Sequence, residues 1–188
     1  MRTDVQRRMF TADEYHRMAK TGILGCDDRV ELVDGAIVEM PPIGSRHMAC
    51  VDRLNLLLQR RFAGEAIVRV QGPVRLDPYS EPQPDLALLE HRADFYETAH
   101  PGPANVLLVI EVADSSLPFD RAVKLPLYAR SGVPEVWLVD LVHDRIEVFT
   151  RPSPDGYRAS AAASRGEAIP SDLLSPSRVL ADDVLGAR

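Results

Sequence analysis

Apolar and polar residues alternate along the chain in short runs that predict both helices and strands. Thr11-Ala-Asp-Glu14 matches the capping box that opens a helix, and we expect this helix to continue to about Lys20. Asp34-Gly35 stands between two apolar runs, which is the pattern of a β-hairpin. Apolar residues then recur at helical spacing, so a second helix is expected from its cap at Ser45 to about Phe62.

Strands dominate the rest of the chain. Short apolar runs predict strands at 67–76, 84–89, 105–112, 135–140, 145–150 and 157–163. The run at 105–112 is the most hydrophobic of them, which indicates a central strand. One further helix is expected from about Asp120 to Arg130, and Pro126 requires that it either starts late or bends.

The order of these elements predicts one α/β domain over residues 1–188, with a mixed β-sheet and helices packed against it. The chain has 188 residues, of which 45% are hydrophobic and 27% charged. That length is enough for one well-formed core and short for two. We expect the extension at 151–188 to pack on the edge of the sheet.

Composition indicates a cytoplasmic protein that binds no membrane. No apolar run approaches the roughly 20 residues of a membrane helix, and the N-terminal segment lacks the apolar stretch of a signal peptide. Cys26 and Cys50 form no C-x-x-C pair, so we expect free thiols. The sequence shows no zinc signature, P-loop, dinucleotide fingerprint or serine-hydrolase elbow.

Charge is unevenly distributed along the chain. The net charge is −6, whereas proteins that bind DNA through many phosphates usually carry a basic excess. Basic residues nevertheless predominate at 46–75, and acidic residues predominate at 77–114. This arrangement suits a metal site beside a phosphate-binding surface, although ordinary solvated charge would explain it equally well.

Two carboxylates stand in strands that are otherwise apolar. Glu111 lies within the run VLLVIEVA, and a buried carboxylate must be paired, protonated or bound to a metal. Asp85 opens the preceding apolar strand, and strand alternation allows both acids to face the same side of the sheet. Such a pair predicts a site for a hard divalent cation such as Mg²⁺, to which the Val112 carbonyl could add an oxygen.

Lys124 is the candidate cation for such a site. It lies on the helix that follows the Glu111 strand, on one face with Asp120 and Tyr128, and it could stabilise negative charge on a reacting phosphate. Each candidate also has a structural interpretation. Asp85 could cap a turn, Glu111 could pair with Lys124 alone, and Lys124 could be solvated. Tyr128 and Trp137 are expected in the core.

Two further residues are weaker candidates. His47 lies on the apolar stripe of the second predicted helix, where a hydrogen-bonded core histidine is the commoner outcome. Glu31 lies in the first strand of the hairpin, where a solvent-facing residue is expected.

The motifs in combination resemble the Uma-type family of proposed restriction endonucleases, within the PD-(D/E)xK nuclease superfamily. The resemblance runs from about residue 11 to residue 150. It rests on VELVDG at 30–35, PPxGxxH at 41–47, QPD at 83–85, Glu111-Val112, D-x₃-K-x₃-Y at 120–128 and GVPEVWLVD at 132–140. It implies a restriction-endonuclease-like fold and metal-dependent hydrolysis of DNA phosphodiester bonds, with Mg²⁺ or Mn²⁺.

The resemblance assigns roles residue by residue. Asp85 and Glu111 match the acidic metal ligands, and His47, Glu31 and Asp120 match residues that recur near the site. The usual lysine two positions after the second acid is here Ala113, and Lys124 looks like its replacement from the adjacent helix.

Three functions remain open from the sequence. The first is a DNA endonuclease, expected as a homodimer because cutting both strands requires two sites. The second is an inactive member that binds DNA or protein, since a shared fold does not prove activity. The third is a metal-dependent hydrolase of a small phosphorylated substrate.

Overall fold

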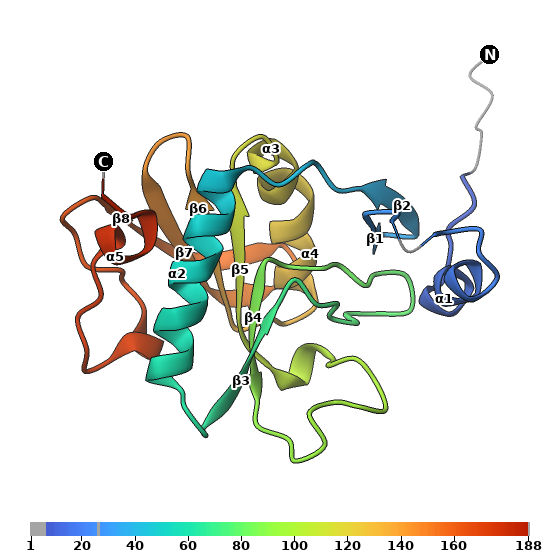
Figure 1. The fold of residues 1–188 in the computed structure, drawn as a ribbon, viewed down its shortest axis with the longest axis horizontal. Coiled ribbons are helices and arrows are strands. Elements are labelled where there is room, and N and C mark those ends of the chain that lie inside the picture. The colour runs from blue at the N-terminus through green and yellow to red at the C-terminus, as the bar shows by residue number, and fades with distance from the viewer. Residues whose placement is uncertain (1–6, 26, 188) are drawn as a thin grey trace.

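A six-stranded β-sheet with helices on both faces forms the body of the molecule in the computed structural model, which describes residues 7–25 and 27–187 (Figure 1). In spatial order its strands are β3 (Ala66–Val70), β4 (Leu86–Glu90), β5 (Val106–Ala113), β6 (Glu135–Asp140), β7 (Arg145–Ser153) and β8 (Gly156–Ser164). β5 and β6 are parallel and the other neighbours are antiparallel. The expected mixed sheet is thus confirmed, with β5 in an interior position.

The N-terminal part forms a helix and a separate hairpin beside this body. α1 (Ala12–Lys20) begins with the expected capping box, and β1 (Val30–Val33) pairs with β2 (Ala36–Glu39). Asp34 and Gly35 both have positive φ, which is the requirement of the tight two-residue hairpin turn. Figure 1 shows α1 at one end of the molecule, with the hairpin between it and the sheet.

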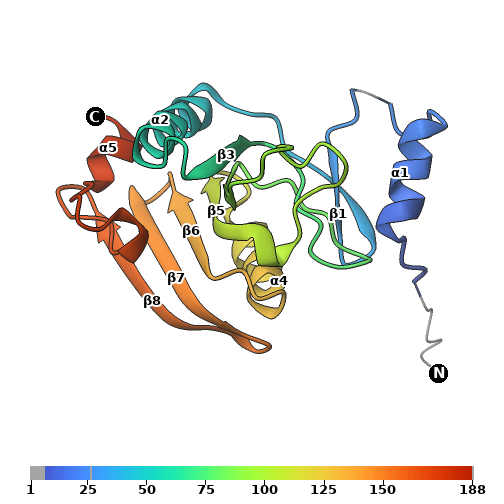
Figure 2. The same ribbon diagram turned by 90° about the horizontal axis from the view of Figure 1, so that it is seen from below.

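One face of the sheet is covered by α2 (Ser45–Arg61). The expected apolar stripe of this helix is buried against the sheet, and the free thiol of Cys50 is buried with it. Gly44, rather than Ser45, is the cap residue, and Ser45 is the first helical residue. Figure 2 shows α2 and the short C-terminal α5 (Ala181–Leu185) on one side of the sheet and α4 (Leu125–Arg130) on the other. Cys26 lies outside the described residues.

The helix on the opposite face differs from its prediction. It starts earlier than expected, as α3 (Leu117–Phe119), and passes through a π-helical turn, η2 (Asp120–Lys124), before α4. Pro126 stands in the first turn of α4 and has no N–H to donate, and its ring crowds the carbonyl four residues earlier. The wider turn accommodates this, and the N–H of Leu125 donates to the carbonyl of Asp120. Tyr128 and Trp137 are fully buried, as predicted.

The strand expected at 67–76 is shorter in the structure. β3 ends at Val70, and the next residue, Gln71, has φ of 47° and turns the chain. The N–H of Gln71 donates to the carbonyl of Asp85, just before β4 begins at Leu86. A short 3-10 turn, η1 (Pro103–Asn105), leads into β5.

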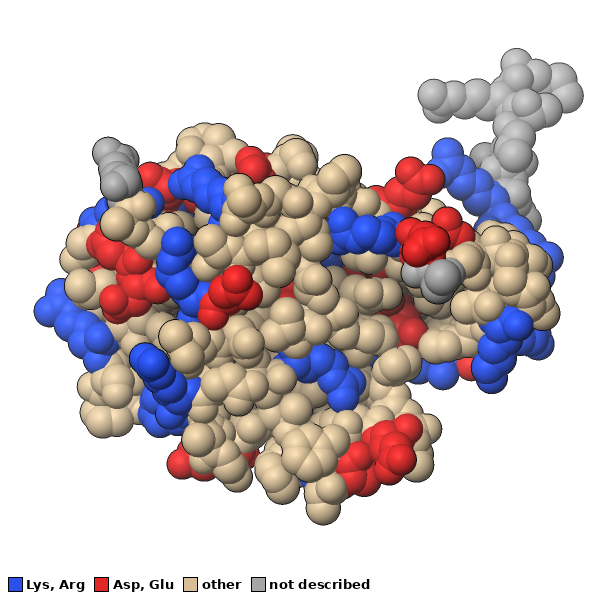
Figure 3. All heavy atoms as spheres, viewed as in Figure 1, with Lys and Arg blue, Asp and Glu red and all other residues tan. Residues whose placement is uncertain are grey.

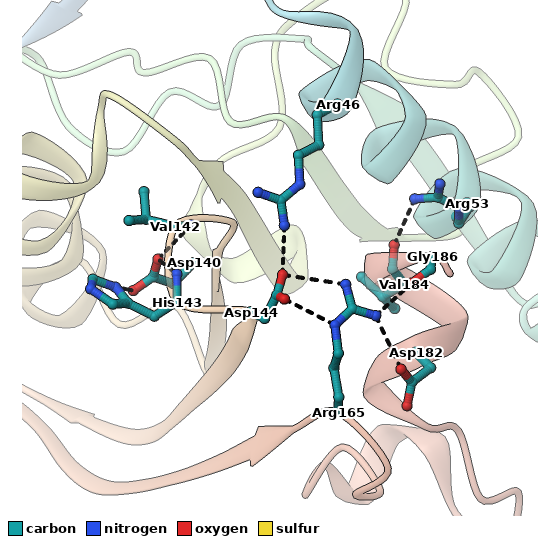
Figure 4. Close-up of polar contacts among 10 residues, drawn as sticks. All are labelled: Arg46, Arg53, Asp140, Val142, His143, Asp144, Arg165, Asp182, Val184 and Gly186. Carbon is teal, nitrogen blue, oxygen red and sulfur yellow. Dashed lines mark hydrogen bonds and ion pairs between the residues drawn. The ribbon is translucent and has the colours of Figure 1, made fainter. Parts of the chain in front are cut away.

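The C-terminal extension does more than pack on the edge of the sheet. β8 is itself the edge strand, and the following segment, with η3 (Asp172–Leu174) and α5, packs beside α2 on one face. Figure 4 shows how this segment is held: Asp144, in the turn before β7, contacts Arg46 of α2 and Arg165, and Arg165 also reaches Asp182 and the Gly186 carbonyl. No helix among residues 7–25 and 27–187 is long and apolar enough to cross a membrane.

Candidate metal and catalytic site

The two carboxylates predicted from the strands lie at the same end of neighbouring strands. Asp85 directly precedes β4, and Glu111 lies near the end of β5, its antiparallel neighbour. A cavity of about 380 Å³ opens at this end of the sheet. Its walls include Glu31, His47, Asp85, Glu111, Val112, Asp120 and Lys124. Every residue proposed for the site from the sequence therefore lines one cavity.

Asp85 is held by three hydrogen-bonding groups. Its Oδ2 accepts the backbone N–H of Val112 at 2.9 Å and lies 3.0 Å from Nε2 of His47, while its Oδ1 accepts from the Gln71 side chain at 3.3 Å. The Asp85 carboxylate is thus fixed against the end of β5 rather than capping a turn. Ligating carboxylates are commonly held in this way by neighbouring donors.

Glu111 is 4% exposed, and its contacts fall on one oxygen. Its Oε1 accepts from the Tyr128 hydroxyl at 2.6 Å and lies 3.0 Å from Nζ of Lys124. Tyr128 was expected only as a core residue, and its hydroxyl also positions Glu111. Glu111 therefore forms the salt bridge with Lys124 that was the structural alternative to a metal site. Both residues nevertheless line the cavity.

Glu31 is buried, and it is not the solvent-facing strand residue that alternation favoured. Its Oε2 lies 3.1 Å from Nζ of Lys124 and accepts the backbone N–H of Gln83 at 2.9 Å. The Gln83 side chain in turn donates to the Val30 carbonyl. Gln83 therefore fastens the hairpin to the segment that carries Asp85, a role that the sequence did not reveal.

The π-helical turn sets the position of the cation. Asp120 and Lys124 stand at its two ends, and both are buried and line the cavity. An extra residue in a turn changes which side chains of a helix face its neighbour, and such turns are frequent at functional sites. The position two residues after Glu111 is occupied by the buried Ala113, so Lys124 is the cation that reaches the acids.

The buried charges perturb one another. Burial raises the pKa of Glu111 to about 8, against the opposing effect of Lys124. Burial alone would lower the pKa of Lys124, but Glu111, Glu31 and Asp120 raise it instead. The pKa of Asp120 is raised by burial as well. Carboxylates thus exceed cations in this cavity, an imbalance that a divalent cation would relieve.

His47 connects α2 to the site. The hydrogen bond with Asp85 raises the pKa of His47, while burial opposes that shift. Its other ring nitrogen, Nδ1, is buried and has no hydrogen-bond partner among the described residues. An unsatisfied buried nitrogen beside a cavity is a place where a water molecule or a ligand would gain a hydrogen bond.

The donor set suits a hard divalent cation. Asp85, Glu111 and the Val112 carbonyl offer oxygen atoms, which Mg²⁺ and Mn²⁺ prefer. Sequence reasoning did not identify Gln71 or Gln83 as supporting residues. Both are polar side chains in irregular segments, where no periodic pattern marks a functional position.

Charge on the outer surface is mixed. On the face shown in Figure 3, basic and acidic side chains are interspersed, and neither sign forms a continuous area. The basic stretch at 46–75 therefore does not form a broad positive surface on this side of the molecule.

Comparisons with known proteins agree on the fold. The family model Uma2, described as "Putative restriction endonuclease", matches residues 12–181. A solved structure from Anabaena variabilis ATCC 29413, titled a "putative nuclease belonging to DUF820", is similar with a TM-score of 0.71 and 14% identity, over 94% of this chain and 97% of that chain. No curated protein matches the chain.

Proposed function

The chain belongs to the Uma2 family, and on that premise we propose that it is a metal-dependent endonuclease that hydrolyses DNA phosphodiester bonds. The observation that carries the proposal is that Asp85, Glu111 and Lys124 line one cavity, at the edge of the sheet where β4 begins and β5 ends. The family description and the nuclease-like neighbour support the same reaction class.

Asp85, Glu111 and the Val112 carbonyl would hold Mg²⁺ or Mn²⁺. When bound, such an ion polarises a phosphate and lowers the pKa of a coordinated water. Tyr128 and Gln71 position the two carboxylates through the hydrogen bonds described above. These contacts fix the ligands before substrate arrives.

Lys124 supplies positive charge where negative charge develops on the phosphate. Its ammonium group is buried between Glu31 and Glu111, so it remains protonated at neutral pH. A fixed, desolvated charge acts more strongly there than it would in water. Glu31 orients this ammonium group, and Asp120 adds to the field that keeps it charged.

His47 is placed to assist with a proton or a water molecule. One ring nitrogen contacts Asp85 and the other, Nδ1, has no partner in the described part of the chain, so the ring has hydrogen-bonding capacity left for a water or a phosphate oxygen. The hydrogen bond with Asp85 raises its pKa and so favours the protonated ring.

The test is cleavage of plasmid and single-stranded DNA with Mg²⁺, Mn²⁺ or EDTA. Wild type should cut only with metal, and Glu111→Gln and Asp85→Asn should not cut. Glu90→Gln, at the exposed end of β4, is the matched control and should retain activity. Equal cutting by wild type and Glu111→Gln would reject the assignment and indicate a contaminating nuclease.

A small phosphorylated substrate is the second candidate, favoured by the net charge of −6 and the mixed surface charge in Figure 3. Hydrolysis of a small aryl phosphodiester without any DNA binding would support it. DNA affinity that falls steeply with salt would support the endonuclease.

Assembly belongs to the same proposal. We expect one domain over residues 1–188 and a homodimer, because cleavage of both strands requires two sites. A monomeric mass by light scattering at micromolar concentration would contradict the dimer.

A further inference from the structure

A second group of metal-binding side chains lies outside the proposed catalytic cavity. His16 on α1, Glu81 in the segment before β4 and His100 in the loop before η1 come together from three distant parts of the chain. One ligand atom from each lies within 4.8 Å of the other two. Sequence signatures of zinc sites depend on ligands that are closely spaced along the chain. These three residues are far apart in the sequence, so they form no such signature.

Glu81 is the centre of this group. It is 2% exposed, and its Oε1 lies 2.7 Å from Nε2 of His16 and 4.0 Å from Nε2 of His100. Its other oxygen, Oε2, is buried and has no hydrogen-bond partner among the described residues. A buried carboxylate oxygen without a partner costs free energy, so it indicates a ligand that would satisfy it.

The two histidines are presented as ligands. Their rings are stacked with centroids 5.7 Å apart, and each directs Nε2 toward Glu81. Both rings therefore present their Nε2 atoms to the same carboxylate oxygen, Oε1 of Glu81.

The group is open to solvent on one side. His16 and His100 line a surface cavity of about 530 Å³, so both imidazoles can be reached from solvent. The nearby Arg75 is paired with Asp13 at 2.6 Å, so it does not occupy the Glu81 carboxylate.

We propose that His16, Glu81 and His100 bind a transition-metal ion of the Zn²⁺ class, with a fourth position open to water. Two imidazoles and one carboxylate suit Zn²⁺, whereas the all-oxygen cavity at Glu111 suits Mg²⁺. Ligand atoms on a tetrahedral zinc ion lie about 3.3 Å apart, given bonds of about 2.0–2.1 Å. The observed separations of 2.7 and 4.0 Å bracket that value, so small side-chain movements suffice.

This ion would tie α1 to the wall of the catalytic cavity. The backbone N–H of Glu81 donates to the Leu32 carbonyl in β1, next to Glu31. Two residues after Glu81, Gln83 donates to Glu31 itself. The zinc site thus stabilises the N-terminal helix and the hairpin that supplies Glu31.

The test uses the full chain without a polyhistidine tag, stripped of metal with EDTA and transferred to chelator-free buffer. Zn²⁺ is titrated at pH 7.5 in competition with a chromogenic chelator. His16→Ala, His100→Ala and Glu81→Gln should each bind at least tenfold more weakly than wild type. His91→Ala, at an exposed histidine outside the group, is the matched control. Glu111→Gln shows whether the measured Zn²⁺ binding involves the proposed catalytic cavity.

Thermal unfolding provides the second measurement. Zn²⁺ should raise the Tm of wild type, His91→Ala and Glu111→Gln, and should leave the three ligand variants unchanged, while melting in EDTA shows that each variant is folded. Wild-type affinity in either His16→Ala or His100→Ala would overturn the three-ligand site. Zn²⁺ binding that is lost in Glu111→Gln and kept in His16→Ala would overturn it as well.

Discussion

Nζ of Lys124 lies 3.0 Å from Oε1 of Glu111, although one residue belongs to a π-helical turn and the other to an interior strand. The same nitrogen lies 3.1 Å from Glu31 in the separate hairpin. One buried cation, on the helical segment between β5 and β6, therefore contacts both the sheet and the N-terminal hairpin.

Replacing this cation should destabilise the fold. Lys124→Met leaves Glu31 buried without its counter-charge and removes the cation that lowers the pKa of Glu111, and removal of one partner from a buried ion pair costs about 3–5 kcal/mol. Urea denaturation in EDTA at pH 7 measures the loss, and Lys20→Met, at the exposed end of α1, should change little. A loss below about 1 kcal/mol would show that the acids are neutral without Lys124.

The Tyr128 hydroxyl should affect metal binding more than stability. Tyr128→Phe removes the donor to Glu111, which costs about 1–2 kcal/mol of stability and about tenfold in Mn²⁺ affinity. Tyr157→Phe is the matched control, because it removes a tyrosine hydrogen bond to the Val133 carbonyl, away from the cavity. If calorimetry finds equal Mn²⁺ affinity in the two variants, Tyr128 has only a structural role.

Metal affinity should depend on pH through Glu111. Burial raises its pKa to about 8, so below that pH a proton must leave before the carboxylate can bind Mn²⁺. Apparent affinity should fall by up to about tenfold per pH unit from pH 8 to pH 6. Calorimetry in buffers of different ionisation enthalpy detects the released proton, and a pH-independent affinity over this range would contradict the shift.

The same raised pKa of Glu111 also makes the stability of the metal-free protein depend on pH. The direction of this pH dependence is opposite to that of an acid whose pKa is lowered by an ion pair. An acid whose folded pKa is raised from 4.5 to about 8 contributes stability that is fully present below pH 4.5 and is lost as pH rises toward 8. Wild type in EDTA should therefore lose stability relative to Glu111→Gln across this window. A constant difference in Tm between pH 5 and pH 8.5 would argue against it.

Truncation should show that the C-terminal segment belongs to the core. Ile169, Leu174, Val184 and Leu185 are buried in the cluster formed with α2, and each buried side chain of this size contributes about 1.5–3 kcal/mol. A chain ending at residue 164 should lose most of a typical stability of about 5–15 kcal/mol. An unchanged cooperative melt would show that residues 1–164 fold independently.

Much of the fold could be predicted from local patterns. Asp34-Gly35 marked the hairpin because few other residue pairs accept positive φ, and the capping box at Thr11 marked the start of α1. Strand alternation allowed Asp85 and Glu111 to share one face, because side chains of alternate residues share a side of the sheet. These rules depend on a few neighbouring residues, so the sequence alone is sufficient to apply them.

The remaining features depend on contacts between distant segments. Pro126 indicated a late start or a bend of the helix, and the π-helical turn is a third way to accommodate its missing N–H. Gln71 donates from both its backbone and its side chain to Asp85, and Gln83 donates from its backbone to Glu31 and from its side chain to the Val30 carbonyl. Such contacts leave no periodic trace in a sequence, which is why the roles of both residues escaped prediction, although Gln83 stands in the QPD motif at 83–85.

The cavity residues also differ in how far apart they lie along the chain. Tyr128 and Glu111 are separated by 17 positions, His47 and Asp85 by 38, and Gln83 and Glu31 by 52. The entropy lost on closing a loop grows with its length, so the Glu111 contacts require the smallest closure. One strand–helix unit can therefore assemble the carboxylate, its hydroxyl donor and its ammonium partner, while Glu31 and His47 depend on long-range docking. A variant that disrupts the hairpin would consequently lose Glu31 but keep Glu111 with its partners Tyr128 and Lys124.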